Sequence, residues 1–231
     1  MPQPSQLTNQ RSEPTISQTD QHVYVGFPET YCVLSSAFYN GGFTEAKHLL
    51  NLKVAKHYKG NQTPQESLKT YCSEQQWQGT TVGMMTAASM KSLRIHRATE
   101  QDTTLTVLAT AGLANARRIG DPADYPTSDI QTPSAGTINI MVISSCAFSP
   151  AAMVEAIQMV TEAKTAAIYD LNIESPKSNR VATGTGTDAT AIACAPTQNR
   201  IEYCGKHVVV GELLGRLSYN AVLEAATEGL A

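Results

Sequence analysis

The sequence predicts a single layered domain of the α/β (or α+β) class, with a mixed sheet and packed helices. Apolar runs typical of strands alternate along the chain with longer segments that have helical spacing and helix-capping residues. The chain has 231 residues, of which 42% are apolar, and this length is sufficient for one domain with a packed core.

The clearest strand signal is the run Thr-Ile-Asn-Ile-Met-Val-Ile-Ser-Ser at residues 137–145. An unbroken apolar run of this length predicts a strand that is buried on both faces. Shorter β-rich runs bounded by turn residues predict further strands at residues 22–27, 31–36, 105–110 and 189–194.

Helix signals occur in three places. A capping box with proline at the first helical position predicts a helix over residues 63–76, and a Ser-Pro pair opens a second helix over 149–171. Apolar residues at helical spacing predict a third helix over about 210–228. Residues 111–118 are interpreted as a loop that enters a further helix, and the two arginines there could meet an anionic group.

The N-terminal segment differs in composition from the rest of the chain. Residues 1–20 are rich in Gln, Ser, Thr and Pro, and after Met1 their only bulky apolar side chains are Leu7 and Ile16. Such a segment buries too little surface to offset its ordering entropy. We expect residues 1–20 to form a disordered polar tail and residues 21–231 to form a single domain.

Charge and composition argue against several classes of protein. The 17 basic and 20 acidic residues give a net charge of −3, which is too balanced for a dedicated nucleic-acid binder. We expect no membrane span, because no apolar run reaches ~18–20 residues. We also expect no secretory signal, because the N-terminal segment has neither a basic region nor an apolar one. The five widely spaced cysteines, without a Cys-x-x-Cys pair, predict reduced thiols in a cytoplasmic protein.

A lysine interrupts the apolar face expected on the helix over residues 149–171. At about 100° per residue, Lys164 lies in the middle of a stripe whose other members are apolar, and Glu162 lies on the opposite face. A lysine on a core-facing stripe snorkels to solvent, pairs with an acid or acts as a perturbed amine. Lys164 is therefore a candidate catalytic cation, with an ion-paired structural lysine as the alternative. The apolar members are Met153, Ile157, Val160, Ala167 and Leu171.

The run Ala-Thr-Gly-Thr-Gly-Thr-Asp at residues 182–188 leads into a predicted strand. Its glycines permit close backbone approach, and N–H groups in such a loop can hold an oxygen anion or an amide carbonyl. It lacks the ending of a phosphate-binding loop and the third glycine of a dinucleotide fingerprint. We expect Asp188 to act in catalysis and Thr185, Gly186 and Thr187 to bind substrate. A turn held by hydroxyl-to-backbone bonds is the alternative.

Other segments offer further polar groups. The Asn40-Gly41 turn could hold an amide that polarises a carbonyl, and a plain turn is the alternative. Thr137 and Asn139 lie at the mouth of the expected central strand. His207, just before the last expected helix, is the candidate proton-transfer group, with a structural histidine as the alternative. No His/Cys cluster has metal-ligand spacing, so no obligatory tight zinc site is expected, and a metal held by residues distant in the sequence stays open.

Several stretches form an ordered set. They are LSSAFYNGGF (34–43), VGMMTAA (82–88), ATAGLANARRIGD (109–121), GTINIMV (136–142), SPAAMVEAIQMVTEAKTAAIYDLNI (149–173), ATGTGTDA (182–189) and GKHVVVGELLGRLSYNAV (205–222). In this order they resemble the adenosylcobinamide amidohydrolase family of corrinoid salvage. The resemblance covers about residues 22–225. Ser144-Ser145-Cys146 departs from it, because many relatives are expected to have an acidic residue there.

The resemblance implies hydrolysis of the amide that joins the aminopropanol arm of adenosylcobinamide to the corrin ring, giving adenosylcobyric acid. The substrate is then a small-molecule corrinoid that brings its own cobalt, so no protein cofactor is expected. The oligomeric state stays open. Amide hydrolysis needs a nucleophile, carbonyl-polarising groups and a proton donor. The expected roles are nucleophile for Thr137, polarising group for Asn40 or Asn139, proton donor for His207, charge stabilisation for Lys164, and substrate or water positioning for Thr187 and Asp188.

A second similarity concerns the fold. Gly136-Thr137 ahead of a buried strand, followed by a Ser-Pro helix, is similar to the core of self-cleaving aminopeptidases and ornithine acetyltransferases. In those families cleavage before a Ser or Thr exposes an N-terminal nucleophile, and Thr137 would take that role here. An unprocessed chain that activates a water is the alternative mechanism. The alternative functions are an N-terminal-nucleophile peptidase or acyltransferase, and a corrinoid-binding protein without turnover.

Overall fold

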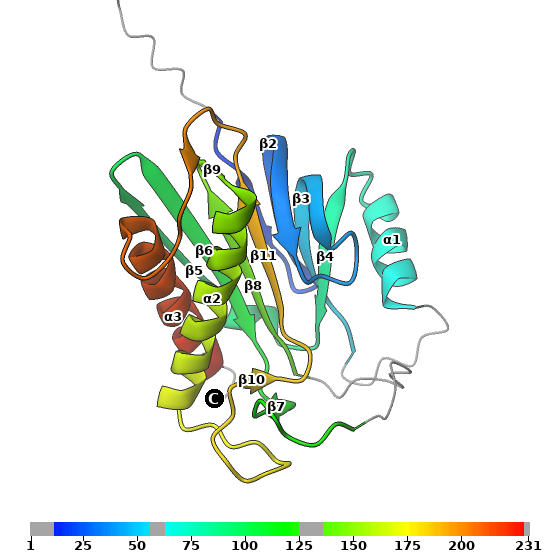
Figure 1. Cartoon of the computed structure of the whole chain (residues 1–231). Coiled ribbons are helices and arrows are strands. Elements are labelled where there is room, and N and C mark those ends of the chain that lie inside the picture. Colours follow the sequence, from blue (N-terminus) through cyan, green and yellow to red (C-terminus); the bar gives the residue numbers. More distant parts are fainter. Residues whose placement is uncertain (1–11, 56–62, 125–135, 229–231) are drawn as a thin grey trace, which may run out of the picture.

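The computed structural model describes residues 12–55, 63–124 and 136–228. Within these residues one mixed sheet of eight strands carries the fold, and helices pack on it, which confirms the predicted fold class (Figure 1). The strands of this sheet are β1 (Thr15–Gln18), β2 (His22–Ser35), β3 (Gly42–Lys53), β4 (Thr81–Thr86), β5 (Arg94–Glu100), β6 (Thr103–Ala111), β8 (Ile138–Ser144) and β11 (Ala189–Cys194).

The strand order is β4-β3-β2-β11-β8-β6-β5, with β1 paired to β2. β11 runs parallel to β8, and β4 runs parallel to β3. The shorter elements are the strand pairs β7 (Ala116–Arg117) with β10 (Gly184–Thr185) and β9 (Ala147–Phe148) with β12 (Arg200–Ile201), and a 3₁₀ turn at Met90–Ser92. The helices are α1 (Pro64–Glu74), α2 (Pro150–Asp170) and α3 (Val209–Glu228).

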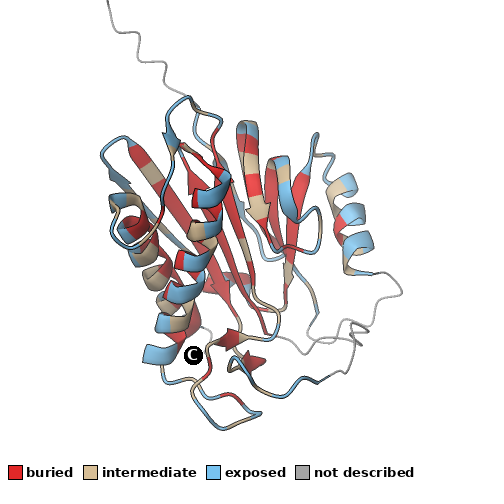
Figure 2. Cartoon of the chain, in the orientation of Figure 1, coloured by how far each residue is buried: buried red, intermediate tan, exposed pale blue. Residues whose placement is uncertain are grey.

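Helices α2 and α3 lie side by side on one face of the sheet (Figure 1). α2 packs on β11, and α3 packs on β5 and β6. Met153 of α2 and Leu214 of α3 share one core with Ile140 and Ile192 of the central strands. All seven residues of β8 are buried, as the unbroken apolar run predicts. Figure 2 shows that burial is greatest along these central strands and on the helix faces turned toward them. The strand that carries Thr137 at its start is therefore a rigid support.

The sheet curves so that β3 and β4 approach β8. In the strand order they are separated from β8 by β2 and β11, yet Asn139 of β8 donates to Asn51 Oδ1 at 2.8 Å and to the Met85 carbonyl at 2.9 Å. Strand twist and a register shift between Gly26 and Tyr31 in the β2–β3 pair accommodate the curvature. A second core fills the inside of this curve.

The prediction of a disordered tail over residues 1–20 is wrong for residues 15–18, which form β1. β1 pairs with β2, and Ile16 packs against the second core. Glu13 also pairs with Arg97 of β5 at 2.5 Å. Sheet hydrogen bonds and the burial of Ile16 offset the ordering entropy that composition alone leaves uncompensated. Residues 1–11 lie outside the described residues.

Other predictions have mixed outcomes. The strands expected at 105–110, 137–145 and 189–194 and the three expected helices are confirmed, including the Thr63–Glu66 capping box of α1. The runs at 22–27 and 31–36 belong to one bent strand, β2. The helix expected after the loop at 111–118 is wrong, because β7 pairs with β10 and this pairing uses the backbone of Ala116 and Arg117.

Candidate active site

Backbone segments 112–116, 136–137 and 184–188 meet at the end of the sheet where β8 and β11 begin. The Gly112 N–H donates to the Thr137 carbonyl at 3.0 Å, and the Gly186 N–H donates to the Asn115 carbonyl at 3.1 Å. The β7–β10 pair joins the first segment to the last. This junction holds the glycine- and threonine-rich turn against the start of β8.

Asp188 ties the junction to α2. Its Oδ1 accepts the Ile138 N–H at 3.0 Å and the Thr185 hydroxyl. Its Oδ2 accepts the Thr185 N–H at 3.0 Å and the Lys164 ammonium at 2.5 Å. Each carboxylate oxygen thus has two donors, which fills its usual lone-pair capacity. The arrangement suits a residue that holds the turn in place.

Lys164 lies on the sheet-facing side of α2, as predicted, and the structure shows the ion-paired alternative. The side chains of Lys164 and Asp188 are only 14% and 13% exposed. Because both charges are largely removed from water, the loss of either leaves an unpaired buried charge. Glu162 is exposed on the opposite face, where it pairs with Lys206.

Thr137 and Thr187 place two hydroxyls beside this ion pair. Their Oγ1 atoms are 2.5 Å apart, and the Thr187 hydroxyl donates to the Gly136 carbonyl at 3.0 Å. Since the Thr187 proton goes to that carbonyl, the Thr137 hydroxyl is the donor to Thr187. This orientation leaves the lone pairs of Thr137 Oγ1 available to an electrophile. We call the side chains of Thr137, Lys164, Thr185, Thr187 and Asp188 the polar cluster.

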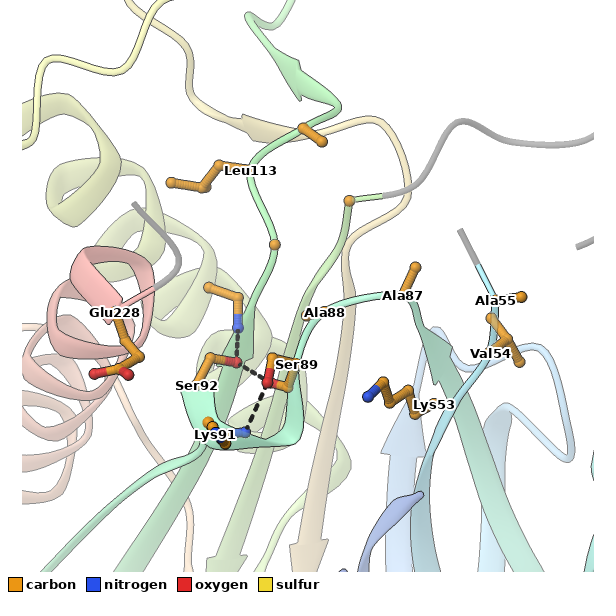
Figure 3. Close-up of a pocket in the computed structure, with 14 residues that line it drawn as sticks. Lys53, Val54, Ala55, Ala87, Ala88, Ser89, Lys91, Ser92, Leu113 and Glu228 are labelled. Carbon is orange, nitrogen blue, oxygen red and sulfur yellow. Dashed lines mark hydrogen bonds between the residues drawn. The ribbon is translucent and has the colours of Figure 1, made fainter. Parts of the chain in front are cut away.

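A cavity of about 500 Å³ reaches Gly136, just before the start of β8 (Figure 3), and its lining includes no residue of the polar cluster. Gly136, the residue before Thr137, forms part of its wall, and most other lining residues are small or apolar. Figure 3 shows Lys53 and Glu228 on opposite sides of the cavity, and Glu228 also pairs with Arg94 at 2.8 Å. A concave, mostly apolar site with few polar groups is typical of small-molecule binding.

The structure brings the predicted turn residues 185–187 together with Thr137, Lys164 and Asp188. It does not bring Asn40, Gly41 and Asn139 to the same place. Within the described part of the chain, none of these three has a side-chain hydrogen bond to the polar cluster. Asn40 donates to the Thr81 carbonyl at 2.8 Å and lines a second cavity, of about 430 Å³, together with Trp77. Asn139 faces the inside of the curved sheet.

His207 lies in the exposed loop between β12 and α3. Its neighbour Lys206 pairs with Glu162, on the face of α2 opposite Lys164. The described residues show no contact between His207 and the polar cluster, so its catalytic role stays a prediction. The departure at Ser144–Cys146 lies at the other end of β8 from Thr137, where Ser144 Oγ donates to the Cys146 carbonyl at 2.8 Å.

Cys194 and Cys204 are poor candidates for a nucleophile. All five cysteines are free thiols. Burial raises the pKa of Cys194, and burial together with the Glu155 carboxylate raises the pKa of Cys204 to about 12. A thiol with so high a pKa forms little thiolate. Residues 12–55, 63–124 and 136–228 contain no group of His, Cys, Asp and Glu that could hold a metal ion. No helix in these ranges is long and apolar enough to cross a membrane.

Sequence reasoning missed Asn115 and the cavity. The two arginines of that segment bind neighbouring loops of the protein: Arg117 pairs with Asp124, and Arg118 donates to the Val181 carbonyl at 2.7 Å. Asn115, which touches the turn at Gly186, gives no periodic signal, since its neighbours come from distant parts of the chain. Its place in one of the stretches shared with the resembled family was the available hint.

The fold and the site together define an α/β protein with a pair of hydrogen-bonded hydroxyls near a cavity of small-molecule size. The chain belongs to the adenosylcobinamide amidohydrolase family, whose pattern matches residues 5–230. It is similar to the adenosylcobinamide amidohydrolase of Methanosarcina mazei, with 26% identity over 200 residues that cover 83% of this chain and 86% of that protein. It is also similar to an uncharacterized protein of Methanocaldococcus jannaschii, with 33% identity over 156 residues. That match covers 62% of this chain and spans 61% of the relative's length.

Proposed function

We propose that the protein hydrolyses the amide bond between the aminopropanol arm and the corrin ring of adenosylcobinamide, with adenosylcobyric acid as the product. Family membership supports the reaction class, and the relative from Methanosarcina mazei carries the name of this activity. One observation carries the proposal: the Thr137 hydroxyl is oriented by Thr187, and the residue before Thr137, Gly136, lines a cavity of about 500 Å³. The substrate is a small corrinoid with its own cobalt, and the protein works in the cytoplasm without a resident cofactor.

In this reaction an oxygen nucleophile attacks the amide carbonyl carbon, the carbon–nitrogen bond breaks, and the amine leaves with a proton. Thr137 Oγ1 either attacks directly or orients the attacking water. Both routes consume one water and give a carboxylate and a free amine. The Lys164–Asp188 pair fixes the turn that carries Thr187, so the hydroxyls of Thr137 and Thr187 keep a fixed position relative to the substrate. His207 keeps the role of proton donor only as a sequence-based prediction.

Incubation of the purified protein with adenosylcobinamide, followed by chromatography for the free acid, tests this function. Formation of adenosylcobyric acid supports it. Binding of the corrinoid without turnover favours a corrinoid-binding protein. If neither product nor binding is found, the proposal fails, and the result favours the peptidase or acyltransferase alternative.

A specific observation favours self-cleavage as a second candidate mechanism. The carbonyl of Gly136, which belongs to the peptide bond before Thr137, accepts the Thr187 hydroxyl at 3.0 Å. That hydrogen bond polarises the carbonyl that a Thr137 hydroxyl would attack during cleavage. The new N-terminal amine of Thr137 would then serve as the base in catalysis. Denaturing mass spectrometry of active protein distinguishes the two mechanisms. A single species of 24.8 kDa excludes cleavage, and two fragments that end at Gly136 and begin at Thr137 establish it.

A further inference from the structure

We propose that the side-chain amide of Asn115 donates a hydrogen bond to the carbonyl oxygen of the scissile amide. This inference rests on the proposed amide hydrolysis. Asn115 lies in the loop between β6 and β7, at the junction of backbone segments described above. It is therefore close to the residues that flank Thr137 and Thr187.

Asn115 is a buried polar residue whose side chain is unused. It is 7% exposed, and its side-chain amide has no hydrogen-bond partner among residues 12–55, 63–124 and 136–228. Its backbone is fixed, because its carbonyl accepts the Gly186 N–H at 3.1 Å. Neither amide atom of Asn115 is among the fully buried side-chain atoms without a partner, so the amide keeps some access to solvent, from which a ligand could accept its protons.

Two glycines make room for Asn115. A Cβ at Gly186 would lie 2.7 Å from Asn115 Nδ2, so the absence of a side chain there lets the amide approach the turn. A Cβ at Gly136 would lie 2.5 Å from the Asn115 backbone nitrogen, and Gly136 has a φ of +139° that disfavours other residues. Asn115 is thus held between the residue before Thr137 and the residue before Thr187.

Other candidates for a polarising donor already donate hydrogen bonds within the protein. Asn40 Nδ2 donates to the Thr81 carbonyl, and Asn139 Nδ2 donates to Asn51 and Met85. The Lys164 ammonium donates to Asp188. Of the three asparagine amides, only that of Asn115 donates to no described residue. Asn40 keeps one amide proton but lies at the second cavity, and Lys164 keeps two ammonium protons beside Asp188. A positioned donor of this kind stabilises the oxyanion that develops as the carbonyl carbon is attacked.

Steady-state kinetics on adenosylcobinamide with Asn115→Ala and Asn115→Asp test the inference. Both variants remove the donor, and Asn115→Asp keeps the shape of the side chain. We expect kcat to fall by about 10²–10³ with KM within about threefold of the wild type, because the donor acts mainly in the transition state. Asn220→Ala in α3 is the matched control, and its kcat stays at the wild-type value.

Gly186→Ala provides an independent variant, because its methyl group would displace the Asn115 amide. It should lower kcat in the wild-type background but not further in the Asn115→Ala background, since the two changes act on one interaction. Wild-type turnover with unchanged kcat in both Asn115 variants overturns this inference alone. Additive losses in the Gly186→Ala cycle also overturn it. Absence of wild-type turnover overturns the proposed function, and the inference with it.

Discussion

The polar cluster at the start of β8 can be compared with an aromatic cluster between β2, β3 and α1. We define the aromatic cluster as His22, Tyr24, His48, Tyr71 and Trp77. His22 Nδ1 is 2.7 Å from the Tyr71 hydroxyl, and His48 Nδ1 is 2.8 Å from the Tyr24 hydroxyl. The second nitrogen of His48 bonds to the Gln78 carbonyl at 2.9 Å, and Trp77 stacks on Tyr24 at 4.3 Å between ring centroids. These hydroxyls and ring nitrogens bond to one another or to the Gln78 carbonyl.

The region around the polar cluster also contains a closed network, but it leaves some groups free. The Asp188 carboxylate is saturated with four donors, whereas in the described residues the lone pairs of Thr137 Oγ1 accept no hydrogen bond and the Asn115 amide donates none. A cavity begins at Gly136 beside them. The difference teaches that burial of polar groups alone does not mark a site. What marks it is oriented groups that remain unused beside a cavity.

The largest effect is expected from Thr137→Ala. Loss of the nucleophile, or of the group that orients the water, should lower kcat for adenosylcobinamide by at least about 10³. Thr137→Ser keeps the hydroxyl and should retain measurable turnover. Product chromatography measures both variants. Wild-type rates in Thr137→Ala would remove this end of the sheet from the mechanism.

Removal of Asp188 should have the next largest effect, this time on stability. Asp188→Ala leaves the Lys164 charge buried and unpaired, so we expect the free energy of unfolding to fall by about 3–5 kcal/mol. The turn loses its anchors, and turnover falls as well. Urea unfolding measures the loss. A Lys164→Met/Asp188→Leu double variant has no unpaired charge, so its free energy of unfolding should fall less than that of Asp188→Ala. A larger fall would show that the unpaired Lys164 charge is not the main cause of the loss.

A smaller, pH-dependent effect is expected in the aromatic cluster. Burial lowers the pKa of His22, so the unfolded chain binds a proton more readily than the folded chain. Stability should therefore be complete above about pH 6.5 and should decrease as the pH falls through the lowered pKa of the folded state. Urea unfolding at several pH values, with His22→Asn as the control, measures this term. An identical pH dependence in the variant would contradict the assignment to His22.

The smallest effect is expected from His207→Ala. Because His207 is exposed and the described residues show no contact with the polar cluster, kcat should stay within about threefold of the wild type. The role predicted from the sequence instead requires a loss of orders of magnitude. The same kinetic assay separates the two interpretations.

Sequence patterns predicted the elements and residues whose signals are local. Helix phase located Lys164, and the composition of the turn located Thr185, Thr187 and Asp188. The partner of Lys164 could not be predicted, because the ion pair joins α2 to a turn 24 residues away. Asn115 stayed unnoticed for the same reason. β1 was missed because its order comes from pairing with β2, which the polar composition of its own residues does not reveal.

The most direct test of the central claim is the position of the scissile amide in a complex of adenosylcobinamide with the Thr137→Ala variant. A crystal structure of this complex should show the corrinoid in the cavity bounded by Gly136, with the amide carbonyl within about 3 Å of the Asn115 amide and next to residue 137. A corrinoid seated instead in the second cavity, between Asn40 and Trp77, would contradict the account.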